Sequence, residues 1–295
     1  MITITKDLTI AKYVTHAGNF HADDVFSTVF LEKLYNDITI IRLKEYQDDN
    51  TKLAYDIGCG KFDHHQAGYD KIRPNGIHYC GFGLLWQEFG LEYLKKIKVS
   101  NPEDTFQVFD YLLINAIDAI DNGEFEHHNA YNVYTISTLV ELFRPKFDEE
   151  KDEDAAFLEA VNFATTLFDL ILKDAISKVK MQSIIKAKIP TIKNRVLVLD
   201  TYVPYEFALF NLGIDKEIDF VVYPSNRGGF AAHTVPEKYR GYKPKVCFNP
   251  KWAGLRDEAL QKVSCIKTAR FCHNNLFIAT ADTLEDTLKF IKLSK

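Results

Sequence analysis

The chain has 295 residues, of which 46% are hydrophobic, 26% charged and 13% aromatic. This length favours two domains, and the ordinary composition excludes a collagen, a disordered protein and a low-complexity array. Lys and Arg number 36 against 41 Asp and Glu, and the resulting net charge of −5 argues against a uniformly basic nucleic-acid binder.

The chain shows no sign of a membrane or secretory destination. No uncharged apolar run approaches the roughly 18 residues that a membrane helix needs. The N-terminus has neither the apolar core of a signal peptide nor the Arg-rich pattern of a transit peptide. The five cysteines contain no C-x-x-C pair, which argues against a disulfide framework and a zinc ribbon. We therefore expect a cytoplasmic protein without a membrane partner.

In chain order, the first third alternates between strand and helix patterns. A short strand at 11–15 ends at His16, and apolar residues at helical spacing predict a helix that begins near Ala22. Apolar runs at 38–43 and 53–57 are typical of buried parallel strands. This repetition predicts an α/β fold whose N-terminal domain holds a parallel sheet covered by helices.

The rest of the chain predicts further helices and a second, smaller α/β domain. The acidic stretch 147–154 predicts a solvated loop or a helix start. We place the domain boundary near 183–192 and expect domains at 1–185 and 191–295. The remaining predicted elements are helices at 80–98, 104–120, 155–181 and 282–292, and strands at 196–199, 218–223 and 229–235.

Histidines and aspartates gather near the N-terminus. His16, His21 and Asp23 fall within eight residues at a strand–helix junction, where the crevices of α/β sheets lie. Two imidazoles and a carboxylate suit a cation such as Mn, Fe, Co or Zn. The alternative is a plain helix N-terminus, at which Asp23 and Asp24 are favoured by the helix dipole.

A second group of the same residue types favours the metal interpretation. Asp56 ends an apolar strand, and Asp63, His64 and His65 follow within ten residues. A strand-end carboxylate is costly unless a metal or a donor satisfies it. Consecutive histidines point in different directions, so His64 and His65 can serve metal and substrate separately, while Asp63 fixes a ring tautomer.

A third group lies on a predicted helix. Asp118 and Asp121 are spaced i, i+3 on one face of an otherwise apolar segment that ends at Asn-Gly. Either this is an exposed polar helix end, or Asp121 completes a metal site that Asp118 supports. His127 and His128 follow, and they can approach the site or simply be exposed.

The C-terminal domain contains a basic stretch. Residues 223–256 hold seven Lys and Arg against one acid, a net charge of 7 − 1 = +6. Arg227 lies beside Gly228 and Gly229, which let a backbone approach phosphates closely, and Arg240 and Arg256 are further candidate substrate contacts. Tyr and Trp interleaved with the basic residues favour a single-strand-binding surface, unless they serve the core of a basic loop. The interleaved aromatic residues are Tyr239, Tyr242, Phe248 and Trp252.

These motifs together resemble a known family. H-x-G-x-F-H-x-D, the strand-end Asp, D-H-H and I-D-A-I-D-N-G resemble the DHH phosphoesterase superfamily, and within it the melanocyte proliferating gene one family of metal-dependent hydrolases. RPKFDEEKDEDAAFLEAVNFA resembles that family's connecting segment, while KWAGLRDEAL and ARFCHNNLFIA resemble its C-terminal motifs. The resemblance covers nearly the whole chain. It implies a DHH-type N-terminal domain and a 3′–5′ exonuclease activity on RNA that depends on manganese.

The resemblance also implies roles for single residues. It implies that His65 faces the substrate, that Asp24 supports the ligands, and that His233 ends a glycine-rich substrate stretch. Two positions depart from the family pattern, because Asp24 replaces a usual Glu and Ala279-Thr280 replaces usual glycines. The implied metal ligands are His16, His21, Asp23, Asp56, His64 and Asp121.

Six ligands are enough for two metal ions about 3.5–4 Å apart, with Asp56 as the natural bridge. We therefore expect a phosphoesterase in which water activated by two metals attacks phosphorus, with Asp56, Asp63 and His65 at the reacting centre. Mn²⁺ is the expected metal, with Mg²⁺, Co²⁺ or Zn²⁺ as alternatives, and the expected substrate is single-stranded RNA or a short oligonucleotide. The alternatives are a nucleotide or pyrophosphate phosphohydrolase and a non-catalytic, metal-containing nucleic-acid-binding protein. A homodimer is left open.

Overall fold

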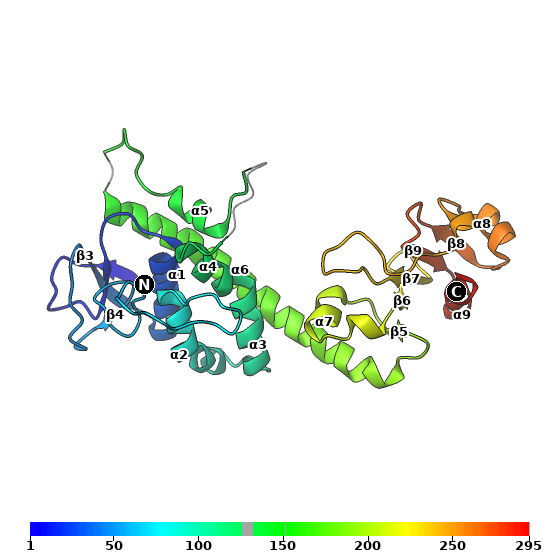
Figure 1. The fold of residues 1–295 in the computed structure, drawn as a ribbon, viewed down its shortest axis with the longest axis horizontal. Coiled ribbons are helices and arrows are strands. Elements are labelled where there is room, and N and C mark those ends of the chain that lie inside the picture. Colours follow the sequence, from blue (N-terminus) through cyan, green and yellow to red (C-terminus); the bar gives the residue numbers. More distant parts are fainter. Residues whose placement is uncertain (126–131, 151, 295) are drawn as a thin grey trace. The chain divides into compact units, whose positions relative to one another are not determined.

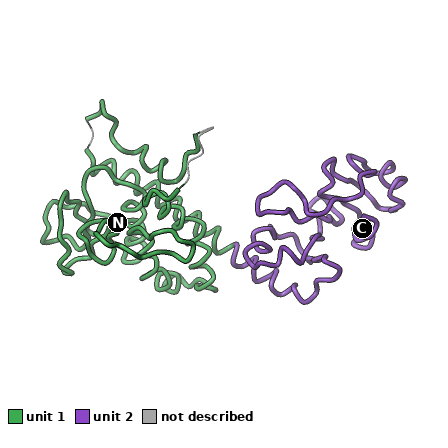
Figure 2. The backbone as a smooth tube through the Cα atoms, viewed as in Figure 1, with its two compact units in different colours: residues 1–177 green, residues 178–295 purple. Residues whose placement is uncertain are grey.

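The fold is that of a computed structural model, which describes residues 1–125, 132–150 and 152–294 (Figure 1). His127 and His128 therefore lie outside the described residues. The chain divides into two compact units, Met1–Ser177 and Lys178–Lys295 (Figure 2). The division falls inside the long helix α6 (Glu153–Lys188), a few residues before the boundary expected near 183–192.

Unit 1 contains a four-stranded sheet in which all pairs are parallel, as predicted, with the order β1-β3-β2-β4. Val14 at its centre is fully buried, and its neighbours across the ladder are Ile41 and Ala54. The last strand is shorter than the predicted 53–57, because the backbone leaves the extended region at Asp56, which has φ +55°. The strands are β1 (Ile2–Ile4), β2 (Tyr13–His16), β3 (Ile38–Leu43) and β4 (Leu53–Ala54).

Helices cover this sheet, and α1 lies at their centre (Figure 1). Its Phe30 is fully buried and its ring packs against Phe82, Trp86 and Phe168 of two other helices. The helix predicted at 104–120 is two α-helices joined by a π-helical turn at Asp110–Ile114. The helices are α1 (Ala22–Tyr35), α2 (Gly81–Lys96), α3 (Pro102–Phe109), α4 (Asn115–Asp121) and α5 (Ile136–Glu141), followed by α6.

Helix α6 is the one described segment that is long and apolar enough, by length and composition alone, to cross a membrane. The interior helix of a compact protein passes the same test when its apolar side is buried. Here Phe157, Ala164 and Phe168 are fully buried, and Phe168 packs against Phe109 and Phe30. The apolar face of the N-terminal part of α6 is thus part of the core of unit 1.

Unit 2 is built on a five-stranded mixed sheet with the order β5-β6-β7-β9-β8. Only the β5–β6 pair is parallel, and the other three pairs are antiparallel. The strands predicted at 196–199, 218–223 and 229–235 and the helix at 282–292 are present, whereas the β8–β9 hairpin was not expected. The elements are β5 (Val196–Val198), α7 (Glu206–Asn211), β6 (Phe220–Pro224), β7 (Phe230–Thr234), α8 (Asp257–Ser264), β8 (Ala269–Cys272), β9 (Ile278–Ala281) and α9 (Leu284–Ser294).

The core of unit 2 corrects one sequence expectation. Phe248 and Trp252 were expected to interleave with basic residues on a binding surface, but their exposed fractions are only 1% and 2%. Both rings pack against Phe290 of α9, beneath one face of the sheet. Burial of large rings contributes more free energy than an exposed position allows, so these two aromatics serve the core.

Candidate metal centre

The histidines and aspartates of unit 1 converge where strands β2 and β4 end. Ligand atoms of His16, His21, Asp24 and Asp56 all lie within 4.8 Å of one another. Nε2 of His16 is 3.2 Å from Asp56 Oδ2 and 3.3 Å from Asp24 Oδ2. This first cluster combines two imidazoles with two carboxylates, a donor set that suits a divalent transition metal.

A second cluster lies on the other side of Asp56. Ligand atoms of Asp23, His64 and Asp121 lie within 4.8 Å of one another. His64 Nε2 is 3.0 Å from Asp121 Oδ2, and its Nδ1 is 3.6 Å from Asp23 Oδ2 and 3.7 Å from Asp56 Oδ1. Asp56 therefore has one oxygen toward each cluster, which is the arrangement that a bridging carboxylate needs.

His65 and Asp63 form a third group around Asp56. The Asp63 carboxylate accepts hydrogen bonds from the backbone N–H groups of Cys59 and His65, and it lies 2.9 Å from His65 Nδ1. Burial acts to raise the pKa of Asp63, but the hydrogen bonds from His65 and Cys59 outweigh it and lower that pKa to about 2. An ionised Asp63 favours the proton of His65 on Nδ1, and the side chain of His65 is itself exposed.

Helix starts position the two neighbouring acids Asp23 and Asp24. His21 precedes α1, and its backbone N–H donates to Asp24 Oδ1 at 2.7 Å in a capping-box arrangement. Asp23 instead accepts from the backbone N–H groups of Gly81 and Phe82, at 2.8 and 2.5 Å, where α2 begins. Asp24 thus accepts a hydrogen bond from the backbone of His21 and brings its other oxygen to the first cluster.

A buried ion-pair network lies behind Asp121. Asp118 is fully buried, so the alternative of an exposed polar helix end is wrong for this residue. It accepts hydrogen bonds from Arg73 Nε at 2.5 Å and from the Cys80 N–H at 3.2 Å, and Arg73 also pairs with Asp110. Burial raises the pKa of Asp118 to about 7 although Arg73 and Cys80 act to lower it. This network anchors the helix that presents Asp121.

Two arginines that the sequence did not single out hold the loop between His16 and His21. Arg42 Nη2 donates to the carbonyl of Gly18 at 2.9 Å, and Arg144 Nε donates to the carbonyl of Phe20 at 2.6 Å. Both arginines are remote from the loop in sequence, so no local pattern could have indicated them. They fix the backbone from which both histidines project.

The carboxylates of the centre carry unfavourable charge. Burial raises the pKa of Asp23 to about 6 and acts together with the repulsion of Asp121. Burial, followed by the charges of Asp23, Asp24 and Asp121, raises the pKa of Asp56 well above its ordinary value. Several buried carboxylates in one place are stable only with compensating positive charge or bound protons.

The hydrogen-bond pattern tests whether a metal fits these residues. Among the described side chains, ten buried polar atoms lack a hydrogen-bond partner, and three of them are Asp24 Oδ2, Asp56 Oδ1 and His64 Nδ1. Such atoms cost free energy unless something satisfies them, and all three belong to the clusters described above. Burial also lowers the pKa of His21, with the Arg144 charge adding to the effect, so its imidazole is neutral as a metal ligand requires. The donor set therefore fits divalent cations.

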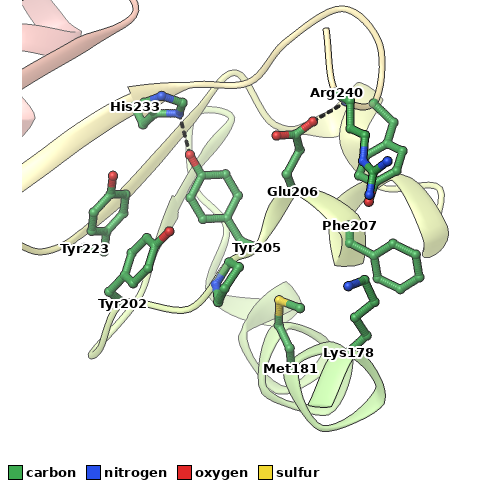
Figure 3. Close-up of a pocket in the computed structure, with 11 residues that line it drawn as sticks. Lys178, Met181, Tyr202, Tyr205, Glu206, Phe207, Tyr223, His233 and Arg240 are labelled. Carbon is green, nitrogen blue, oxygen red and sulfur yellow. Dashed lines mark hydrogen bonds between the residues drawn. The ribbon is translucent and has the colours of Figure 1, made fainter. Parts of the chain in front are cut away.

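The predicted substrate residues of unit 2 separate into two groups. Arg227, Gly228 and Arg256 line a cavity of about 680 Å³. His233 and Arg240 line a second cavity of about 340 Å³, in which His233 contacts Tyr205 (Figure 3). Gly229 lies in the turn between β6 and β7 with φ +66°, where a Cβ atom would be 2.3 Å from the carbonyl of Ala281. Gly229 thus allows close packing of the turn.

Comparisons with known proteins identify the family of the chain. The family model of the MYG1 exonucleases, described as an uncharacterised protein family (UPF0160), matches residues 12–294. A MYG1 protein of Chlamydia pneumoniae is 28% identical over 291 residues, 95% of each chain. A MYG1 protein of Schizosaccharomyces pombe is 24% identical over 96% of this chain and 97% of its own length. The MYG1 exonuclease of Homo sapiens is 25% identical over 94% of this chain and 84% of its own length.

No solved structure matches the chain. Because the family model spans almost all residues, the chain belongs to the MYG1 exonuclease family (UPF0160).

Proposed function

We propose that this protein is a metal-dependent phosphoesterase of the DHH type that removes nucleotides from the 3′ end of single-stranded RNA or short oligonucleotides. The observation that carries the proposal is the pair of His/Asp clusters on either side of Asp56, which belongs to the first and lies 3.7 Å from His64 of the second, with unpartnered buried atoms in each. The name of the human relative, an exonuclease, supports the same reaction class. We propose Mn²⁺ as the metal, because a mixed imidazole and carboxylate set suits it.

The residues of the two clusters would hold one cation each and share Asp56. His16, His21 and Asp24 belong to one cluster and the remaining ligands to the other. When bound, the cations supply Lewis-acid chemistry, by which they activate water and neutralise charge on a phosphoryl group. Their positive charge also offsets the repulsion among the buried carboxylates. The ligands of the second cluster are Asp23, His64 and Asp121.

His65 would contribute directly to phosphate binding. Its side chain is 60% exposed, and its Nδ1 is held by the Asp63 carboxylate. A neutral imidazole with the proton on Nδ1 offers a lone pair at Nε2, whereas a protonated one offers an N–H donor there. We infer that the protonated ring donates from Nε2 to a phosphoryl oxygen, and that ionised Asp63 stabilises the imidazolium.

Purified chain, Mn²⁺ and 5′-labelled single-stranded RNA provide the test. We expect stepwise shortening from the 3′ end, visible as a ladder on a denaturing gel. Asp56→Ala should lower the rate by more than about 100-fold, since even partners that only orient a ligand cost roughly 10–100-fold. The matched control is Asp200→Ala, because Asp200 is an exposed aspartate of unit 2 outside both clusters.

Two outcomes would replace the proposal. Hydrolysis of nucleotides or pyrophosphate with intact RNA would favour a small-molecule phosphohydrolase. Mn²⁺-dependent RNA binding without any product would favour a non-catalytic protein. Activity that survives Asp56→Ala would contradict the role of the two clusters altogether.

A further inference from the structure

Two neighbouring cavities of unit 2 share the side chains of Tyr202 and Tyr223. The smaller one, about 340 Å³, lies between the C-terminal end of α6, helix α7 and the sheet (Figure 3). The larger one measures about 680 Å³, within the range of roughly 300–1,000 Å³ in which small ligands bind. The lining of the larger cavity includes Arg270, Phe271 and His273, which lie in the ARFCHNNLFIA motif but were not predicted to contact substrate.

The floor of the larger cavity is one row of side chains across the sheet. Tyr223 on β6 pairs with Ala231 on β7, Ala231 pairs with Thr280 on β9, and Thr280 pairs with Phe271 on β8. All four residues line the cavity. Because the two central side chains are small and the two outer ones are aromatic, the row is hollow in the middle and has an aromatic wall at each end.

Aromatic rings continue along this side of unit 2 without a break. Each ring centroid is 4.2 to 6.1 Å from the next, close enough for neighbouring rings to interact. Tyr202, at one end, has an exposed fraction of 53%. Arg256 covers the ring at the other end, with its guanidinium carbon 4.5 Å from the centroid of Phe271. The rings in order are Tyr202, Tyr223, Tyr205, His233, Phe277, His273 and Phe271.

Positive charge surrounds the larger cavity. Three arginines and one acid, Asp257, contribute to its lining. Arg227 and Arg256 are exposed, and neither pairs with a carboxylate of the described residues. Arg270 pairs with Asp282 and donates to the carbonyl of Arg227 at 3.2 Å, which holds the arginine-bearing turn at the cavity. Guanidinium groups match phosphate oxygens in geometry and in charge.

We propose that the accessible rings of this row, from Tyr202 to Phe271 without the buried Tyr205, form a stacking platform for the bases of a single-stranded nucleic acid, with Arg227 and Arg256 on its phosphates. Every base has a π-face, so such a platform binds without regard to sequence. This proposal rests on the proposed nuclease function, which identifies the bound polymer as a nucleic acid. The platform implies in addition that the substrate is recognised through its bases. A pyrophosphate substrate has no bases and could not use it.

The test compares two oligonucleotides that differ only in their bases. The full chain is titrated in EDTA with a fluorescein-labelled single-stranded RNA decamer and with an abasic decamer of equal charge, and anisotropy reports binding. Stacking is worth about 1–3 kcal/mol per base, so one engaged base gives roughly a 5- to 150-fold preference for the base-containing strand. Tyr202→Ala should lower this preference at least about fivefold.

Three further variants complete the design. Leu293→Ala is the control, because Leu293 is 51% exposed in the same unit and lines neither cavity, and it should leave the preference unchanged. His273→Ala is a second variant of the platform, in a residue that follows the end of a different strand. Arg256→Ala should weaken binding of both decamers alike and reduce the dependence of affinity on salt.

Equal affinity for the two decamers would overturn the proposal, and so would a Leu293→Ala effect as large as that of Tyr202→Ala. The outcome is separable from that of the nuclease assay, because EDTA removes the metal and binding alone is measured. A chain that hydrolyses RNA but ignores the bases would refute only the platform. A base preference without hydrolysis would refute only the proposed reaction.

Discussion

Arg73→Met should destabilise unit 1, because Arg73 faces two carboxylates. Its Nε lies 2.5 Å from Asp118 Oδ2, and its Nη1 lies 2.5 Å from Asp110 Oδ2. Without the guanidinium, fully buried Asp118 keeps only the N–H and thiol of Cys80 as partners, both at its other oxygen. Removing one partner of a buried pair costs about 3–5 kcal/mol, since the remaining charge is uncompensated. We expect a fall of about this size in the free energy of unfolding at pH 8.

The loss of unfolding free energy in Arg73→Met should be larger at high pH than at low pH. Burial raises the pKa of Asp118 to about 7 even with Arg73 in place, against an ordinary value of 3.8. Removing the cation raises this pKa further, so Asp118 of the folded variant is protonated at pH 5. A group whose pKa is raised by folding contributes stability that is lost as pH rises through the folded pKa. The deficit should therefore shrink to about 1 kcal/mol, the value of the lost hydrogen bonds, at pH 5.

Urea unfolding in EDTA measures this effect. Trp86 lies in unit 1 and Trp252 in unit 2, so a Trp252→Phe background makes the fluorescence report unit 1 alone. Asp118→Asn combined with Arg73→Met should cost less than the sum of the two changes. Lys61→Met is the control, because Lys61 and Glu88 are 54% and 42% exposed and should contribute less than about 1 kcal/mol. Equal losses at pH 5 and pH 8 would refute the reasoning.

Three other changes have definite expected results. Excess Mn²⁺ at 100 times its dissociation constant should stabilise unit 1 by about 3 kcal/mol over EDTA in thermal melts, with the gain lost in Asp56→Asn and kept in Asp200→Asn. Identical melts in Mn²⁺ and EDTA would contradict the metal centre. Burial lowers the pKa of His233 to about 4 from 6.5, so the unfolded chain binds the proton first and stability falls as pH drops between these values. Relative to His233→Gln, unit 2 should lose up to about 3 kcal/mol between pH 7 and pH 4 in urea unfolding followed by Trp252 fluorescence in a Trp86→Phe background, and parallel pH curves would exclude the effect. Gly83→Ala should cost about 1–3 kcal/mol in urea unfolding, since its Cβ would lie 2.5 Å from both carboxylate oxygens of Asp118, and an unchanged urea midpoint would rule out that conflict.

Much of unit 1 could be predicted because its signals are local. The parallel sheet follows from short apolar strands that alternate with helices, and Asp56 is visible as an acid at the end of such a strand. The different roles of Asp23 and Asp24 could not be predicted from the sequence. They depend on the start of α2, almost 60 residues away, whose N–H groups bind Asp23 and leave Asp24 to the first cluster.

Unit 2 was harder to predict, because its surface depends on which side of a sheet each ring faces. Phe248 and Trp252 lie among basic residues in the sequence, yet both are core residues. Antiparallel pairing of β8 with β9 instead brings Phe271 close to Thr280, and the sheet brings both into line with Tyr223. Basic residues interleaved with aromatic ones indicate only that a segment is near solvent. Strand register decides which side chains share a face of the sheet.

Metal stoichiometry tests the central claim most directly. The chain, stripped with EDTA and dialysed against Mn²⁺, is analysed for bound manganese by mass spectrometry. We expect two ions per wild-type chain, one in His16→Ala, one in Asp121→Ala and fewer than one in Asp56→Asn, because Asp56 belongs to the first cluster and lies beside His64 of the second. Wild-type chain that retains no manganese, or Asp56→Asn that retains as much as the wild type, would contradict the metal centre.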